Sequence, residues 1–306
     1  MAGRAAVAHG RRHASGGLNA FRLFSLRLYR AVWRRIPPVL RDTRVGRWYG
    51  RALHAMVLRN SPRQVYLGTF FLRNRPQLEQ IRRLLAGFLR GGTLRITILG
   101  CSIGAEVYSV LWTIRMARPD LEVRTIAADI SPQVIAIGEK AVYSDESCGL
   151  VGESIFERLS AAEREQMFDW NGGSATVKAP LRQGISWQLC DATSPDLGRS
   201  LGAQDMVLAS NFLCHMPPRM AELCLRNIAR LVRPGGHLLV VGVDLDVRQK
   251  VARELGWHPI ADLIREIHDG DPVLRRDWPM QWWGLEPLNE RLPDWQHRYG
   301  ATFRLD

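Results

Sequence analysis

Lysine is nearly absent from this 306-residue chain, which has 39 arginines against only Lys140, Lys178 and Lys250. Because arginine replaces lysine throughout, its abundance alone does not identify an acidic partner. The five cysteines are scattered and form no C-x-x-C pair, which argues against a disulfide framework and a metal site. The sequence also lacks the roughly 18 consecutive apolar residues of a membrane span and the apolar core of a secretory signal. We therefore expect a cytoplasmic protein.

Acidic residues are rare in the first third of the chain. Residues 1–95 contain 20 arginines against Asp42 and Glu79, a charge of +18, so the other 211 residues carry −6 of the net +12. Such asymmetry predicts that the N-terminal third faces an acidic partner or packs against the acidic remainder of the chain. The overall 46% hydrophobic content is enough for a globular core.

Three regions follow from the hydrophobic pattern. Residues 1–17 have no periodicity and are predicted to be a disordered leader. Residues 18–64 form a basic helical segment, with helical spacing over Leu18–Arg35 and Val45–Arg59. An anionic membrane or a nucleic acid would suit these basic helices, but no nucleic-acid-reading module is present, and packing on the chain's own domain is the commoner outcome. Residues 65–306 form the main domain.

Short apolar runs alternate with helical patterns after Leu94, which is typical of βαβ units. The predicted strands are Leu94–Leu99, Val123–Ala128, Ile185–Leu189, Met206–Ala209 and His237–Val243, and the predicted helices are Glu106–Met116, Pro132–Val142 and Met220–Val232. The pattern predicts an α/β fold with a mostly parallel, doubly wound, Rossmann-like sheet. An insertion at about 144–184 contains a capping-box signal, Ser160 and Glu163, and a tryptophan-rich extension follows residue 257.

The first predicted strand ends in a turn of small residues, Gly100 to Gly104, that leads directly into a helix and lets a ligand approach the backbone. A dinucleotide-binding G-x-G-x-x-G motif would need glycine at Ser102 and Ala105, so a nicotinamide cofactor is disfavoured. No G-K-[ST] follows, which also disfavours a Walker-type phosphate site. The second strand ends in Asp129, where nucleotide-binding sheets place an acid that accepts from ribose hydroxyls.

Several segments read in order resemble the CheR-type chemotaxis-receptor methyltransferases over roughly residues 65–245. They are TFFLR, LGCSIGAEVYS, AADIS, KAVYS, VKAPLRQGISWQLCDA, DMVLASNFLCHM and LVRPGGHLLVVGVD. The resemblance implies a class I methyltransferase fold, S-adenosylmethionine as the cofactor and enzymatic methyl transfer.

The resemblance also implies site residues. Thr69 and Arg73 match the family's Thr and Arg, with Arg73 beside the methionine part of the cofactor, and Glu106 matches the second of two glutamates, the first being Ala105 here. Asp129 matches the ribose acid, and Asp191 stands where the family commonly has Asn near the adenine amine. Asn211 matches the Asn after the fourth strand, although Asp191 and Asn211 are also typical strand-end caps. The predicted cofactor site is completed by Gly100, Ser102, Gly104, Ile130, Ala192 and Phe212.

The departure with the largest chemical consequence is His215, which replaces a tyrosine of the family. A carboxylate acceptor such as a protein glutamate needs no base, whereas a small-molecule hydroxyl or amine does, and histidine titrates near neutrality. Arg73 and His215 are therefore the predicted catalytic residues, His215 either as a base or as a group that shapes the site. The tryptophans after residue 257 would line the acceptor site or form a lid on the sheet. The alternative function is a non-catalytic, cofactor-binding regulator with an acidic partner.

Overall fold

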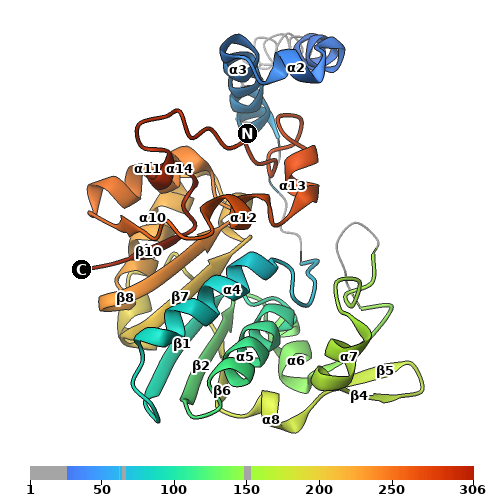
Figure 1. Ribbon diagram of the computed structural model, residues 1–306, viewed down its shortest axis with the longest axis vertical. Helices are drawn as coiled ribbons and strands as arrows, with labels where there is room; N and C mark the ends of the chain where they lie inside the picture. The colour runs from blue at the N-terminus through green and yellow to red at the C-terminus, as the bar shows by residue number, and fades with distance from the viewer. Residues whose placement is uncertain (1–25, 62, 64–66, 148–152) are drawn as a thin grey trace, which may run out of the picture. The chain divides into compact units, whose positions relative to one another are not determined.

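The computed structural model describes residues 26–61, 63, 67–147 and 153–306 of the chain (Figure 1). The chain forms two compact units, one of residues 1–62 and 274–286 and the other of residues 63–273 and 287–306. The predicted leader at 1–17 lies outside the described residues. Among the helices of the described ranges, none has the length and apolarity that a bilayer crossing requires.

Five parallel strands form the core of the larger unit and confirm the predicted sheet. They lie in the order β6-β2-β1-β7-β8, and all four of their pairings are parallel. Their bounds are Thr93–Leu99 for β1, Glu122–Asp129 for β2, Ile185–Leu189 for β6, Gln204–Ser210 for β7 and Val232–Val241 for β8. Every residue of the central strand β7 is buried, which agrees with the continuous apolar run Met206–Ala209 in its middle.

Helices connect these strands and cover the sheet. Figure 1 shows α4 and α5 in front of β1 and β2. Outside the insertion, the described helices of this unit include α4 (Arg75–Leu84), η1 (Leu85–Gly87), α5 (Ala105–Ala117), α6 (Pro132–Lys140), α9 (Leu197–Leu201), η2 (Leu213–His215), α10 (Pro218–Ala229), α11 (Leu245–Glu254), α12 (Ile264–Asp269) and α14 (Trp295–Tyr299). Because the five strands are parallel, the loops that follow them meet at one edge of the sheet.

Two antiparallel strands, which the sequence did not predict, extend the sheet beyond β8. Strand β10 (Thr302–Arg304) pairs with β8, and β9 (His258–Pro259) pairs with β10. Both are too short to show a period in the sequence. They attach the C-terminal stretch to the same sheet as the predicted strands.

The insertion folds as a small antiparallel sheet with a helix beside it. The sheet has the order β3-β5-β4, with β3 at Val142–Ser144, β4 at Phe168–Asn171 and β5 at Ser174–Val177, and the helices are α7 (Ala161–Met167) and α8 (Ala179–Arg182). Helix α7 begins at the predicted capping box, with Ser160 and Glu163 bonded reciprocally. The sequence predicted this helix, whereas the three short strands came from the structure alone.

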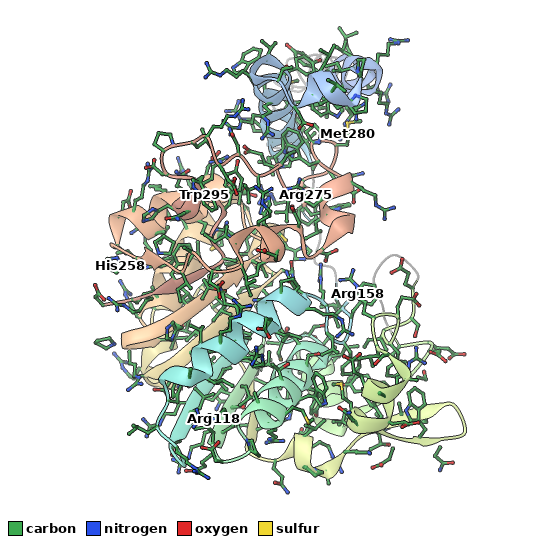
Figure 2. The ribbon with its side chains drawn as sticks, in the orientation of Figure 1. Arg118, Arg158, His258, Arg275, Met280 and Trp295 are labelled. Atoms are coloured by element: carbon green, nitrogen blue, oxygen red, sulfur yellow. The ribbon has the colours of Figure 1, made fainter. Side chains whose placement is uncertain are left out.

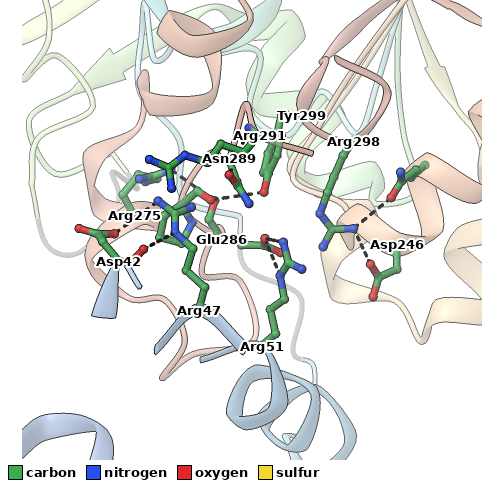
Figure 3. A network of polar contacts seen from close by, with 12 residues as sticks. Asp42, Arg47, Arg51, Asp246, Arg275, Glu286, Asn289, Arg291, Arg298 and Tyr299 are labelled. Atoms are coloured by element: carbon green, nitrogen blue, oxygen red, sulfur yellow. Dashed lines mark hydrogen bonds and ion pairs between the residues drawn. The ribbon is translucent and has the colours of Figure 1, made fainter. Parts of the chain in front are cut away.

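The smaller unit contains the N-terminal helices and part of the tryptophan-rich stretch. Residues 26–35 are helical and are followed by α2 (Pro38–Arg41) and α3 (Arg44–Asn60), and α13 spans Pro272–Arg276. Trp278 is buried, lies edge-on to Trp33 with ring centroids 5.5 Å apart, and approaches α3 where a side chain larger than that of Gly50 would collide with it. Arg51 also pairs with Glu286 in this unit (Figure 3). Trp278 therefore belongs to the core of the smaller unit.

Candidate active site

The turn after β1 contains two glycines whose backbone lies directly against aromatic rings. Gly100 has a φ of +64°, and an added Cβ would lie 2.5 Å from the Phe212 ring. Gly104 has a φ of +89°, and its added Cβ would lie 2.9 Å from the Trp187 ring. Both glycines are thus required by a left-handed backbone and by aromatic side chains packed against them.

Ser102 takes the place of the second glycine of a dinucleotide motif and keeps a left-handed backbone, with a φ of +48°. Two hydrogen bonds hold it there: its N–H donates to Asp129 Oδ2 at 2.9 Å, and its hydroxyl donates to the Leu67 carbonyl at 2.8 Å. The turn is therefore tied to β2 on one side and to the segment that precedes Thr69 on the other.

Asp129 joins the loops that follow β1 and β2. Its side chain is buried, and its two carboxylate oxygens accept the N–H groups of Ser102 at 2.9 Å and of Ser131 at 3.0 Å. Since a carboxylate offers about four acceptor positions, these two bonds leave room for two hydroxyl donors. The next residue, Ile130, exposes 65% of its surface.

The loop after β6 contains the predicted residues Asp191 and Ala192. Asp191 is exposed and caps the loop by accepting the Thr193 N–H at 2.8 Å. The buried Asn227 donates to the carbonyls of Ala192, Thr193 and Ser194, which holds the loop against α10. Asp191 therefore does act as a strand-end cap, while its carboxylate keeps acceptor capacity for a further donor.

The loop after β7 turns sharply at Asn211. This residue has a φ of +60°, and its N–H donates to the Val241 carbonyl at 2.9 Å. Asparagine is one of the few non-glycine residues that adopt this conformation readily. Phe212 follows and packs on Gly100, and the partly buried His215 ends η2.

The segment that contains Thr69 and Arg73 is anchored in the insertion. Phe71 is fully buried and stacks on Phe156 with ring centroids 5.7 Å apart. Leu72 has a φ of +51°, and its N–H donates to the Ser109 hydroxyl at 2.9 Å. Thr69 lies partly buried at the start of this segment, and Arg73 lies at its end.

Glu106, in the first turn of α5, lies in an electrostatic environment shared with Arg73. Burial raises the pKa of the Glu106 carboxyl above its ordinary value, while an interaction with the Ser210 hydroxyl and the positive charge of Arg73 act in the opposite direction. The same arginine acts on Cys214, whose thiol pKa is raised to about 12 by burial. Cys214 is thus a neutral thiol near pH 7 and is unsuited to act as a nucleophile.

A buried ion pair that the sequence did not predict supports the loop after β7. Arg63 Nη2 lies 2.9 Å from Asp244 Oδ2, and the two side chains are only 7% and 10% exposed. Arg63 also donates to the carbonyls of Cys214, at 3.1 Å, and Met216, so it fixes both ends of the turn around His215. Asp244 lies three residues after the last parallel strand, at the N-cap of α11, which is a signal the sequence contained, but Arg63 has no such signal.

The comparisons with known proteins agree with this geometry. Residues 68–253 match the model of the CheR methyltransferase SAM-binding domain, which is more than half of the chain. The chain belongs to the CheR methyltransferase family. This confirms the resemblance drawn from the sequence, and it makes S-adenosylmethionine the cofactor and a class I methyltransferase the fold.

The relatives of this chain are distant. The chain is 29% identical over 216 residues to an uncharacterized 104.1 kDa protein of Rhodobacter capsulatus, and the match covers 63% of this chain but 21% of that one. It is 23% identical over 179 residues to chemotaxis protein methyltransferase 2 of Vibrio cholerae, covering 56% of this chain and 60% of that one. The chain thus spans about a fifth of the first relative and less than two thirds of the second.

Among the solved structures that this chain resembles is magnesium protoporphyrin IX methyltransferase of Synechocystis. The two sequences are 13% identical, the TM-score is 0.35, and the match covers 61% of this chain and 70% of that one. This similarity is too distant to support any conclusion about the function of this chain.

Proposed function

We propose that this chain transfers a methyl group from S-adenosylmethionine to a carboxylate, such as a glutamate of a protein. When bound, the cofactor supplies an electrophilic methyl group on a sulfonium sulfur. Asp129 would accept from the ribose hydroxyls through its remaining lone pairs, Asp191 would accept from the adenine amine, and the exposed Ile130 would cover an adenine face. The loops with Gly100, Ser102, Gly104, Ala192, Asn211 and Phe212 would complete the site.

Glu106 and Arg73 suit the amino-acid end of the cofactor. The amino-acid end of the cofactor carries an ammonium and a carboxylate. Glu106 and Arg73 have the opposite charges, and the two side chains interact electrostatically. Glu106 would accept from the ammonium, and the guanidinium of Arg73 would donate to the carboxylate. Thr69 stands close to Arg73 in the same anchored segment and would lie beside this end of the site.

A carboxylate acceptor is favoured by the family match together with the guanidinium of Arg73 near η2. Arg73 has a larger electrostatic effect than Arg63 on Cys214, which precedes His215, and the charge of Arg63 is offset by its buried partner Asp244. Positive charge attracts an anionic nucleophile and holds it against the methyl carbon, and an ionised carboxylate needs no base. A carboxylate would displace the methyl group from the sulfonium sulfur without a proton transfer, so Arg73 and the loops of the site would contribute alignment and water exclusion.

Methyl transfer from labelled S-adenosylmethionine to acidic peptides tests this proposal. A carboxyl methyl ester releases volatile labelled methanol on mild alkaline treatment, whereas an ether or a methylamine does not. We expect volatile label from acidic peptides. Base-stable label with a phenol or an amine, abolished in His215→Phe, would instead support the small-molecule acceptor with His215 as the base.

A second candidate function is a non-catalytic regulator that binds an acidic protein, and the surface of the smaller unit favours it. Its described residues include eleven arginines against three acidic residues, a charge of +8, together with exposed apolar side chains such as Val45, at 75%, and Trp48, at 68%. Arginines beside exposed aromatics suit an acidic polypeptide.

Polyglutamate serves as a probe for this second candidate. Salt-sensitive binding that is lost in the double variant Arg34→Glu, Arg35→Glu, together with cofactor binding but no turnover on any acceptor, would favour the regulator. Turnover with acidic peptides would contradict it.

A further inference from the structure

Arg73 is held by a carboxylate from beyond the region that matches the family. Arg73 Nε lies 2.9 Å from Asp271 Oδ2, and the two side chains are 17% and 7% exposed. Asp271 follows α12, well after the end of the match at residue 253. The contact therefore joins the family's arginine to the C-terminal stretch of this particular chain.

The choice of atom matters for what Arg73 can still do. A guanidinium has five N–H donors in one rigid plane, and Nε contributes only one of them. A bond through Nε fixes the rotation of that plane and leaves the paired Nη groups, which suit a bidentate bond to a second carboxylate. An arginine on a short loop would otherwise sample many rotamers.

Asp271 is itself held in place by a second arginine. Arg158, which Figure 2 labels, lies with Nη2 3.4 Å from Asp271 Oδ1 and also donates to the Arg73 carbonyl. Its guanidinium carbon lies 4.6 Å from the centroid of the Phe70 ring. Arg158 thus contacts the carboxylate, the backbone of Arg73 and the segment before Arg73 at once.

The backbone segment that precedes Asp271 packs against the start of α4. Asn74 Nδ2 donates to the Ile267 carbonyl at 2.9 Å, and a Cβ added to Gly270 would lie 2.4 Å from Asn74 Oδ1. Only glycine fits at position 270 without a shift. The residues on both sides of the Arg73 to Asp271 bond are therefore fixed relative to each other.

We propose that Asp271 is a positioning residue that orients the guanidinium of Arg73 toward the carboxylate at the amino-acid end of the cofactor, with Arg158 as its support. This rests on the proposed function of Arg73. It assigns the C-terminal stretch a part in cofactor recognition.

Calorimetric titration with S-adenosylhomocysteine and with 5′-methylthioadenosine, which lacks the amino-acid end, tests the proposal on the full chain. In Asp271→Ala we expect binding of S-adenosylhomocysteine to weaken by about tenfold, since the bond lost involves charged groups, while binding of methylthioadenosine stays unchanged. The matched control is Asp262→Ala, because Asp262 lies near the other end of α12 and pairs with Arg83 on the surface, with both side chains nearly half exposed. It should bind both ligands as the wild type does.

The sign of the change separates the explanations. If Asp271 acted only through its charge, its removal would leave the site more positive, and S-adenosylhomocysteine would bind more tightly. If its role were only structural, both ligands would weaken together. Either result overturns the proposal, as does an additive effect of Asp271→Ala and Arg73→Ala, which should be strongly non-additive.

Two further controls keep the test decisive. Asp271→Asn preserves the shape of the side chain and replaces Asp271→Ala if the latter does not fold, with the same expected difference between the ligands. A wild-type protein that binds neither ligand would refute the proposed cofactor site itself, an outcome distinct from a failure of the inference about Asp271.

Discussion

Replacing Asp129 by asparagine should destabilise the larger unit even without a ligand. The carboxylate accepts two backbone N–H groups, from Ser102 at 2.9 Å and from Ser131 at 3.0 Å, and the side chain is only 8% exposed. The Asn side chain has one acceptor oxygen, so its amide nitrogen would face one of the two N–H donors.

The magnitude follows from these two bonds. One hydrogen bond to a charged group is lost, about 1.5 to 3 kcal/mol, and the other becomes an ordinary neutral bond of about 1 kcal/mol. Because Ser102 and Ser131 are partly exposed, water can satisfy the released N–H group, so we expect a loss of about 2 to 3 kcal/mol. In a unit of this size, that corresponds to a decrease in Tm of about 4 to 12 °C.

Differential scanning calorimetry measures this loss, and Asp191→Asn is the matched control. Asp191 lies in the loop after the neighbouring strand β6 and also accepts a backbone N–H, at 2.8 Å, but it is exposed. Its variant should lose less than about 1 kcal/mol. An Asp129→Asn protein that melts with the wild type would refute the reasoning, because it would show that the two bonds do not hold the loops.

Three further predictions follow from the site. The pKa of Glu106 is raised by burial, so the folded state resists its ionisation: Glu106→Gln should be more stable than the wild type at pH 8, and urea titrations should show this advantage vanishing as the pH falls to the ordinary value of 4.5. Gly104→Ala should cost about 2 to 4 kcal/mol, from its left-handed backbone and the collision with Trp187. Gly173→Ala, with a φ of +84° in open space, should lose only the backbone part, and equal losses by thermal unfolding would contradict the packing argument. His215→Phe should bind S-adenosylhomocysteine normally in calorimetry, whereas a large loss of affinity would place His215 against the cofactor.

The sequence alone was enough to predict the parallel sheet and most of its edge. The five predicted strands became β1, β2, β6, β7 and β8. The run in β7 is continuously apolar because that strand is buried throughout, whereas the edge strand β6 is partly exposed and alternates apolar and polar residues. Asp129 could be predicted as well, since parallel strands end at one edge and an acid directly follows the second. The family resemblance added Arg73 and Glu106, which local pattern alone did not single out.

The tertiary structure decided which residues support this edge. Arg63 and Asp271 lie outside the family match, and they reach Asp244 and Arg73 across separations of 181 and 198 residues. No local period encodes such contacts, because they depend on how the helices pack. The glycines show the same limit: the sequence predicted a tight turn at Gly100, but only the fold showed that the Phe212 ring occupies the space where a side chain would lie.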